Sequence, residues 1–265
     1  MYFAWYMKHW TFILLLITLH VSAQKKIEVI QTDKTAIVAD RIVNINNQGK
    51  LLILKDNALV QNISNKENSY ANVQLGNIAS VNAFNPLKIN VFYKDFNSVT
   101  ILDNRLNEIY RIDFNNIRPY RNITHISTGY DNVLWLYNQD TQQLEIYDYK
   151  QDISKGKTLP IEDTVLDLIS NYNSSWLLTE THLISYNYFG SMTSKIKNDG
   201  YTSICETNEN IILKKENRLY YLVKGAKEIV PMDLPELLIK AFFATDETLY
   251  IYDGEFLHQY QLKIT

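Results

Sequence analysis

The sequence predicts an all-β fold, and more specifically a β-propeller of six four-stranded blades, on three observations. Tyr is abundant, with 19 residues, and Gly is scarce, with 8, a balance that favours strands. Short apolar segments recur six times, with centres 35 to 44 residues apart. Each is flanked by alternating apolar and polar segments, and a weaker fourth segment follows. Four short strands that repeat about every 40 residues are typical of a propeller blade.

The six apolar segments are expected to form the second strand of each blade, because that strand has both faces covered by protein. An alternating segment such as "VLDLISN" precedes each of them as the inner strand, and one such as "HLISYNY" follows as the third strand. Segments such as "NEIYRIDF" supply the outer strand. The six second-strand segments are Lys50–Asp56, Ile89–Asp95, Val133–Gln139, Ser175–Thr181, Asn210–Glu216 and Thr248–Gly254.

The two ends of the chain are expected to share the sixth blade. The last repeat has only three strands and stops at Thr265, while the early segment Lys25–Gln31 has no repeat of its own. A bare edge after the final hairpin would invite aggregation, so we expect Lys25–Gln31 to pair with that hairpin and close the ring. A two-sheet sandwich or a barrel is the alternative, since either would also contain many short strands. One helical turn is expected within Met232–Phe242.

The first residues have the pattern of a secretory signal peptide. Lys8 precedes an apolar run from Trp10 to Leu19, and small residues at Val21 and Ala23 suit cleavage after Ala23. The run is too short for a membrane-spanning anchor, and no Cys follows the cleavage point to carry a lipid. We therefore expect a leader at 1–23, one propeller domain at 24–265, export to the periplasm or outer membrane, and no integral membrane anchor after cleavage.

Composition argues against several classes of function. Charged residues make up 21% of the chain and the formal net charge is -3, so nothing indicates nucleic-acid binding. The single cysteine, Cys205, cannot form an internal disulfide and is expected to be a small buried apolar residue.

No motif for catalysis, a metal or a cofactor is present. The histidines after the leader are far apart in the chain, and no zinc, calcium, phosphate-loop or hydrolase motif occurs. A glycosidase needs two facing carboxylates, which in a propeller would come from different blades. We expect no enzyme activity and no cofactor, and treat the candidate side chains as structural: His125, His182, His258, Asp103, Asp163 and Asp167.

Two loops are candidates for binding a protein. The loop Phe92–Val99 exposes Phe96 at a turn, and Asp113–Ile123 joins the second blade to the third. The second loop holds Arg118, Tyr120 and Arg121, and Arg and Tyr are enriched at binding hot spots. We expect these four residues to form a partner-binding patch. The alternative is that the loops pack their aromatic residues down onto the ring.

The stretch "FNPLKINVFYKDFNSVTILDNRLNEIYRIDF", from Phe84 to Phe114, resembles small exported β-propeller proteins of Bacteroidota. A weaker resemblance is to the plug subunit of the type 9 secretion translocon. These resemblances imply an interaction subunit of an outer-membrane or periplasmic complex, and they carry over no catalytic residue.

Three functions therefore stay open from sequence. An interaction module of the cell envelope predicts a featureless central channel and binding loops on one face. A glycan-hydrolysing propeller predicts acidic residues and histidines that converge at the mouth of the channel. A sensor of glycans or other small ligands predicts an aromatic-lined pocket.

Overall fold

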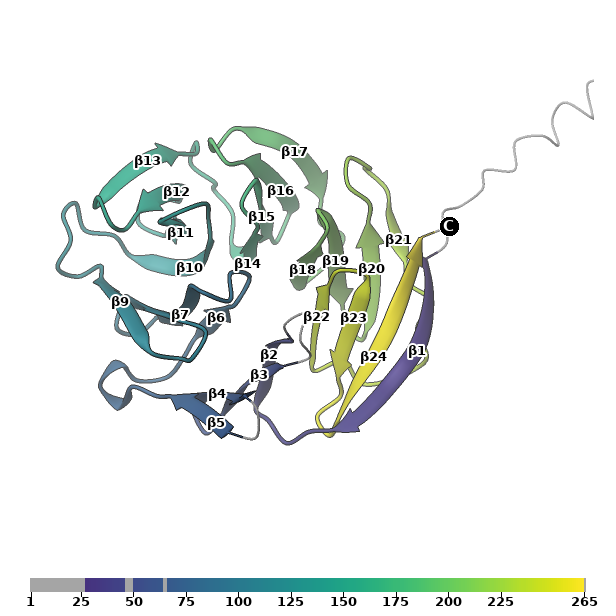
Figure 1. The fold of residues 1–265 in the computed structure, drawn as a ribbon. Helices are drawn as coiled ribbons and strands as arrows, with labels where there is room; N and C mark the ends of the chain where they lie inside the picture. Colours follow the sequence, from purple (N-terminus) through teal and green to yellow (C-terminus); the bar gives the residue numbers. More distant parts are fainter. Residues whose placement is uncertain (1–26, 46–49, 64–65, 265) are drawn as a thin grey trace, which may run out of the picture.

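The computed structural model describes residues 27–45, 50–63 and 66–264. The expected leader at 1–23 lies outside these residues. The described chain is all-β, and its strands form six antiparallel four-stranded sheets arranged as a β-propeller (Figure 1). The predicted fold and the predicted number of blades are confirmed.

Each of the first five blades is a meander in which neighbouring strands are joined by a turn. Within each sheet, the strand order runs from the inner strand to the outer one. The first three blades are β2 (Arg41–Ile45), β3 (Leu51–Lys55), β4 (Ala58–Ile63) and β5 (Lys66–Tyr70); β6 (Ser80–Asn82), β7 (Ile89–Tyr93), β8 (Ser98–Leu102) and β9 (Glu108–Asp113); and β10 (Ile123–Thr128), β11 (Val133–Asn138), β12 (Gln143–Asp148) and β13 (Ile153–Lys157). The next two are β14 (Val165–Ser170), β15 (Ser174–Thr179), β16 (His182–Asn187) and β17 (Met192–Lys197); and β18 (Ser203–Thr207), β19 (Asn210–Lys215), β20 (Arg218–Leu222) and β21 (Ile229–Pro231).

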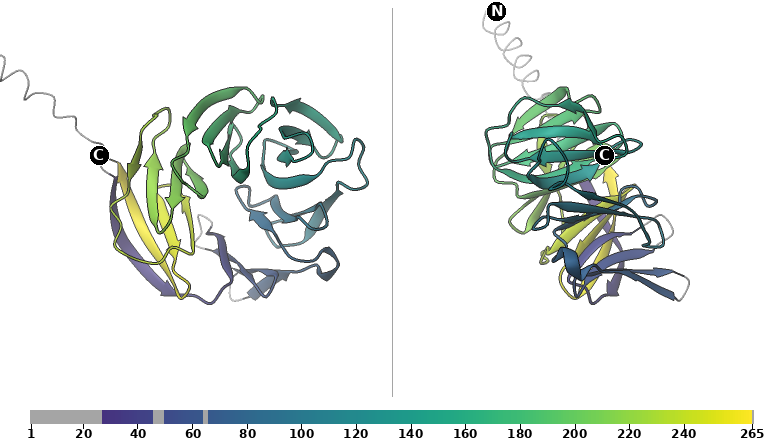
Figure 2. Two further views of the ribbon diagram at one scale, coloured as in Figure 1. Left: turned by 180° about the vertical axis from the view of Figure 1, so that it is seen from behind. Right: turned by 90° about the vertical axis from the view of Figure 1, so that its left-hand side faces the viewer.

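The sixth blade contains both ends of the described chain. It consists of β22 (Ala241–Thr245), β23 (Thr248–Tyr252) and β24 (Phe256–Ile264), with β1 (Ile27–Ala36) as its outer strand. The ladder between β1 and β24 runs from Ile27 opposite Ile264 to Ala36 opposite Phe256, with a bulge after Gln31. The two strands lie side by side at the rim in both ribbon views (Figures 1 and 2). The expected ring closure is confirmed, and β1 is longer than the segment predicted for it.

The hydrophobic core is divided into six clusters, one between each pair of neighbouring blades. Side chains alternate along a strand, so a middle strand supplies two clusters at once. In β11, Val133 and Trp135 face the fourth blade, whereas Leu134 and Leu136 face the second. This two-sided burial explains why the second strands are the most apolar segments of the sequence.

The prediction of a helical turn within Met232–Phe242 is wrong. Residues 232–240 form a bridge and a loop without helix, and Ala241 and Phe242 begin β22. Asn217 holds the loop extended, because its Oδ1 accepts a hydrogen bond from the backbone of Ile239 at 2.7 Å and its Nδ2 donates to the carbonyl of Leu237. Apolar side chains of the loop pack on the core between the fifth and sixth blades, and this packing outweighs local helix propensity. Instead, one short 3-10 helix, η1, forms at Val73–Leu75.

The turns of the meander divide between two faces of the ring. We call one the connector face. It holds the connectors between blades, residues 37–40, 71–79, 114–122, 158–164, 198–202 and 232–240, and the turns between second and third strands, residues 56–57, 94–97, 139–142, 180–181, 216–217 and 253–255. The opposite face holds the remaining turns. In the described part of the chain, no helix is long and apolar enough to cross a membrane.

Closure of the ring gives the first prediction. Ile27 is 0% exposed and lies in the core between the fifth and sixth blades, whereas Ile30 on the same strand is 45% exposed. We expect Ile27→Ala to lower the free energy of unfolding by about 2–5 kcal/mol, the usual cost of truncating a buried Ile. Ile30→Ala, the matched control, should lower it by less than about 1 kcal/mol. Denaturant titration measures both, and equal losses would contradict this role for Ile27.

Candidate functional site

The two loops predicted to form one patch do lie together on the connector face. Asn97 joins them, since its Nδ2 donates to the carbonyl of Arg121 at 2.6 Å and its Oδ1 accepts from the backbone of Ile123 at 3.1 Å. Phe96 is 46% exposed and Tyr120 is 50% exposed, so both rings are accessible to a partner. The expectation that these loops are adjacent and expose aromatic side chains is therefore met in the fold.

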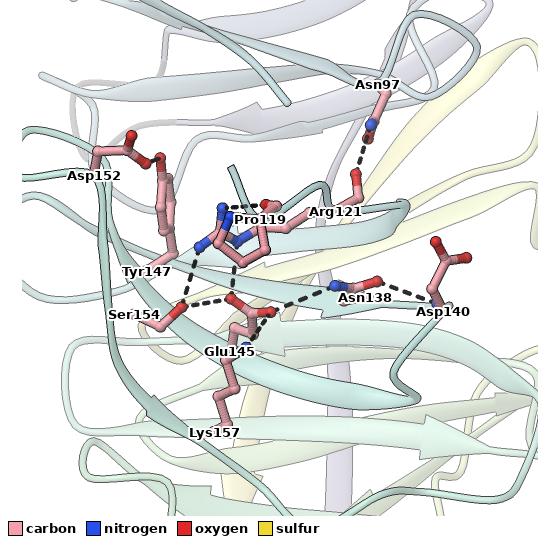
Figure 3. Close-up of polar contacts among 10 residues, drawn as sticks. All are labelled: Asn97, Pro119, Arg121, Asn138, Asp140, Glu145, Tyr147, Asp152, Ser154 and Lys157. Carbon is pink, nitrogen blue, oxygen red and sulfur yellow. Dashed lines mark hydrogen bonds and ion pairs between the residues drawn. The ribbon is translucent and has the colours of Figure 1, made fainter. Parts of the chain in front are cut away.

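Arg118 and Arg121 differ in accessibility. The guanidinium of Arg118 is exposed and donates to the carbonyls of Asn115 and Ile117 in its own loop. Arg121 is only 3% exposed, and its Nε lies 3.0 Å from Oε2 of Glu145 (Figure 3). The expectation that Arg121 contacts a partner is therefore corrected. Its guanidinium forms a buried ion pair with Glu145 and is not available at the surface for a partner.

Glu145 is the centre of a buried polar network. Its carboxylate accepts from Arg121 and, at 2.6 Å, from Ser154, and it lies 3.2 Å from Nζ of Lys157 (Figure 3). Burial opposes its ionisation, but the hydrogen bonds from Ser154 and Arg121 outweigh that effect and hold the pKa of Glu145 below its ordinary value. The Arg121 guanidinium also lies over the ring of Tyr147, 4.7 Å from its centroid. The network fixes the connector 114–122 to the third blade.

Breaking this pair should be costly, because it would leave a buried charge without its partner. We expect Arg121→Ala to lower the free energy of unfolding by about 3–5 kcal/mol. The matched control is the exposed pair of Arg111 and Glu108, 2.6 Å apart, where Arg111→Ala should cost less than about 1 kcal/mol. A combined Arg121→Met and Glu145→Leu variant should recover most of the stability. Denaturant titration checks all three, and an Arg121→Ala loss as small as that of the control would refute the argument.

Every connector but one presents a large apolar side chain to solvent. The most exposed are Val38, Val73 and Leu159, which retain between 81% and 91% of their surface. Tyr120 and Leu238 supply two more connectors, and Phe96 lies on a neighbouring turn. None of these side chains lies on the core clusters of the described residues. The aliphatic members could not be predicted from sequence, because the connectors also hold buried apolar residues, as Ile161 is buried beside the exposed Leu159 in "TLPIED".

The opposite face is hollowed by a cavity of about 1160 Å³ around the axis of the ring. Its described lining comes from every blade except the third and is rich in amides, among them Asn82 and Asn171. Phe84 and Tyr172 meet there edge to face, with ring centroids 4.9 Å apart. The exposed aromatic residues of this face thus pack on one another, unlike those of the connector face.

Of the described acidic residues that line the cavity, Glu206 and Glu209 have side-chain partners within the protein, whereas the carboxylate of Asp246 makes no hydrogen bond or ion pair. Glu206 accepts from Asn171 and from the backbone of Glu209, and Glu209 is paired with Lys224. Burial raises the pKa of Glu206, and these hydrogen bonds oppose the rise only in part. Cys205 also lines the cavity, and burial raises the pKa of its thiol, so the sulfur is protonated at neutral pH. This makes it a poor nucleophile.

The carboxylates singled out in the sequence do not converge on one point. Asp103 accepts from backbone groups of its own turn, and Asp163 accepts from Thr181 across two loops of the connector face. Asp167 bridges two inner strands, because its Oδ2 accepts from the backbone of Ile204 at 2.9 Å. Burial raises the pKa of Asp167 to about 6. Among the described residues, no group of three or more His, Cys, Asp and Glu side chains could hold a metal ion.

The three histidines of the described residues lie in different blades and have different neighbours. His125 is on β10, His182 begins β16 beside Thr181, and His258 on β24 lies 2.8 Å from Asp253. Burial, reinforced by the charge of Lys94, lowers the pKa of His125 to about 4. Each histidine therefore takes part in local packing or hydrogen bonding.

His125 and Asp167 should influence acid stability in opposite directions. The folded pKa of His125 is below its ordinary value of 6.5, so its contribution is present above about pH 6.5 and is lost as the pH falls towards 4. The folded pKa of Asp167 is raised, so its contribution is present at low pH and is lost as the pH rises through about 6. The shift of His125 corresponds to about 3 kcal/mol at most.

We therefore expect His125→Gln to weaken the loss of stability between about pH 7 and about pH 5, and Asp167→Asn to strengthen it. Free energies of unfolding from denaturant titration at both pH values provide the measurement. Parallel changes in the two variants would show that the assigned charge states are wrong.

Comparison with known proteins supports the β-propeller fold and assigns no family. No protein-family model matches the chain, and no curated protein matches it. Among solved structures, selenomethionine-substituted virginiamycin B lyase from Staphylococcus aureus is 11% identical, with a TM-score of 0.60 over 91% of this chain and 100% of that one. BamB from Moraxella catarrhalis is 12% identical, with a TM-score of 0.56 over 89% of this chain and 98% of that one. At such identities the likeness shows a shared β-propeller architecture.

Proposed function

We propose that this protein is a non-catalytic, exported β-propeller that acts as a protein-interaction module at the bacterial cell envelope. The observation that carries the proposal is the set of apolar side chains on five of the six connectors of one face, three of which retain between 81% and 91% of their surface. An apolar patch exposed on a soluble protein marks an interaction surface, and we propose that these side chains together form one. Loops on a rigid scaffold are where such surfaces are usually built.

The internal contacts of most described carboxylates near the axis support the non-catalytic part of the proposal. Glu206 and Asp167 each bridge two blades and Glu209 is paired with Lys224, so Asp246 is the one described carboxylate of the cavity lining without a hydrogen bond or ion pair. Such engagement leaves no pair free to act as acid and base across a pocket. The finer reading, a subunit or plug of an outer-membrane secretion complex, is supported by the leader pattern at 1–23 and by the resemblance over Phe84–Phe114.

Removing the exposed apolar groups should abolish recovery of the partner without unfolding the protein. We expect a Val38→Ser, Val73→Ser and Leu159→Ser variant to lose most of the partner in affinity purification from gently solubilised envelopes, quantified by mass spectrometry. Its free energy of unfolding should change by less than about 1 kcal/mol, because the side chains are exposed.

The matched control carries Leu87→Ser and Phe189→Ser on the opposite face, where both residues are exposed, and should retain the partner. Loss of the partner in the control alone would place docking on the opposite face. Recovery of no partner by the wild-type protein, even with a crosslinker, would contradict the proposed function.

Binding of a glycan in the cavity is the second candidate. The aromatic pair of Phe84 and Tyr172 beside several amides is the observation in its favour, since sugars bind to aromatic faces and polar amides together. The hydrogen bonds of the acidic residues favour binding over hydrolysis. A glycan array with the wild-type protein and with Tyr172→Ala separates the candidates, because only a cavity ligand would depend on Tyr172.

A further inference from the structure

One buried amide of the cavity lining has no partner within the protein. The amides of Asn44, Asn82 and Asn171, on or next to inner strands, each donate to a neighbouring group. Gln61 on β4 is only 7% exposed, yet its side-chain amide makes no hydrogen bond in the part of the chain that the structure describes. Its Oε1 is a buried acceptor without a donor, which costs stability. Because Gln61 lines the cavity, a molecule that enters the cavity can supply the missing donor.

The register of the first blade places Asn68 beside Gln61. The two residues are paired between β4 and β5, two positions from the pair of Leu59 and Tyr70. Leu59 and Tyr70 face the core between the first and second blades, and residues two apart on a strand lie on the same side. Both amides therefore face the second blade. Asn68 is half-buried, and among the described residues its amide also has no hydrogen-bond partner.

A turn of the second blade completes this part of the lining. It joins β8 to β9 and carries Asn104 and Arg105, which both line the cavity. Asp103 fixes the shape of the turn, because its Oδ1 accepts from the backbone of Arg105 and from that of Asn107, each at 2.8 Å. The side chains of Asn104 and Arg105 are exposed and make no hydrogen bond within residues 27–45, 50–63 and 66–264. We call Gln61, Asn68, Asn104 and Arg105 the amide subsite.

The charges of the cavity lining are separated around the ring. The basic residues of the described lining, Lys50 and Arg105, come from the first and second blades. The acidic ones, Glu206, Glu209 and Asp246, come from the fifth and sixth. The amide subsite thus lies on the basic side, where an anionic group of a ligand is favoured.

The residue types of the subsite match hydroxyl groups and a carboxylate. A primary amide carries a donor and an acceptor on one flat group, so neighbouring hydroxyls of a sugar ring can satisfy Oε1 and Nε2 of Gln61 together. The guanidinium of Arg105 can bind a carboxylate through two parallel hydrogen bonds. Phe84, 39% exposed in the same cavity, offers an apolar surface to the C–H groups of a sugar, and ligand sites combine such contacts with a few polar groups.

We propose that the amide subsite binds an acidic sugar, a uronic acid residue of an oligosaccharide. Ring hydroxyls hydrogen-bond to the amides of Gln61 and Asn68, and the carboxylate lies against Arg105. This inference rests on the second candidate function, glycan binding in the cavity, and names the class of sugar. The cavity of about 1160 Å³ is larger than the roughly 300–1000 Å³ usual for a small ligand, so it has room for more than one sugar residue.

The experiment measures binding to the full protein by isothermal titration calorimetry. The probes are a trimer of galacturonic acid and its methyl ester, which has the same rings without the charges. Gln61→Leu removes the amide at nearly constant size, and Arg105→Gln removes the positive charge. The matched controls are Gln151→Leu and Arg218→Gln, at exposed positions outside the cavity lining.

We expect Gln61→Leu to weaken the binding of both trimers by roughly tenfold or more, because hydroxyls of the ligand lose their partner. Arg105→Gln should weaken the binding of the acidic trimer by roughly fivefold or more and leave that of the methyl ester unchanged. Both control variants should bind as the wild type does.

The stability of Gln61→Leu distinguishes a ligand-binding role of the amide from a structural one. The variant should unfold at the same denaturant concentration as the wild type or at a higher one, because it removes a buried polar group that has no partner. A marked loss of stability would show that the fold itself satisfies the amide, and the proposed subsite would then be wrong.

The outcomes separate this inference from the second candidate function. Equal binding of the two trimers, unaffected by Arg105→Gln, overturns the acidic-sugar inference and leaves glycan binding standing. Binding of neither trimer overturns it as well, and the glycan array then decides whether the second candidate stands. Titration with trialanine completes the test, since binding of this peptide through Gln61 without binding of either trimer would assign the subsite to peptides instead.

Discussion

The antiparallel pairing of β1 with β24 is the interaction on which the rest of the ring depends. It joins opposite ends of the described chain, from Ile27 opposite Ile264 to Ala36 opposite Phe256. Closing so long a loop is entropically unfavourable, and contacts this distant in sequence form slowly. The long ladder and the burial of Ile27 offset that cost. Without them, β24 would be a bare edge, and the core between the fifth and sixth blades would lose its outer wall.

The architecture could be predicted because it follows from local rules that repeat. Alternation along strands and a period of about 40 residues both survive in a single sequence. Contacts between blades leave no such trace, since each partner comes from another strand. The burial of Arg121 could not be predicted from its loop alone, although Glu145, a charged residue between apolar neighbours in a mostly buried strand, was a signal. The segment Met232–Phe242 has helix-compatible spacing, but its apolar residues are held against two blades.

Contacts between blades, which a single sequence does not reveal, also explain the polar lining of the cavity. Inner strands of neighbouring blades do not share a sheet, so side chains must satisfy the polar groups around the axis. Asn82 on β6 donates to Ser127 at 3.1 Å and accepts from Thr128 at 2.7 Å, both on β10. Asn171 reaches Glu206 in the same way. Much of the amide lining therefore has a structural reason that holds for any ring of this kind. The amides count for less as a sign of a ligand than the pairing of Phe84 with Tyr172 does.

The buried pair of Arg121 and Glu145 affects docking by fixing the conformation of a connector more than by adding to the stability of the fold. Replacing a buried ion pair by apolar groups is often neutral or stabilising, so stability alone gives little reason for it. What the pair does is hold one connector against the third blade, while Asn97 ties the neighbouring turn to the same backbone. Tyr120 and Phe96 are thereby presented on segments that are already ordered. Ordering loops and side chains is a main cost of association, and a face whose loops are held by internal hydrogen bonds avoids much of it. A partner would then meet apolar side chains on segments that need little further ordering.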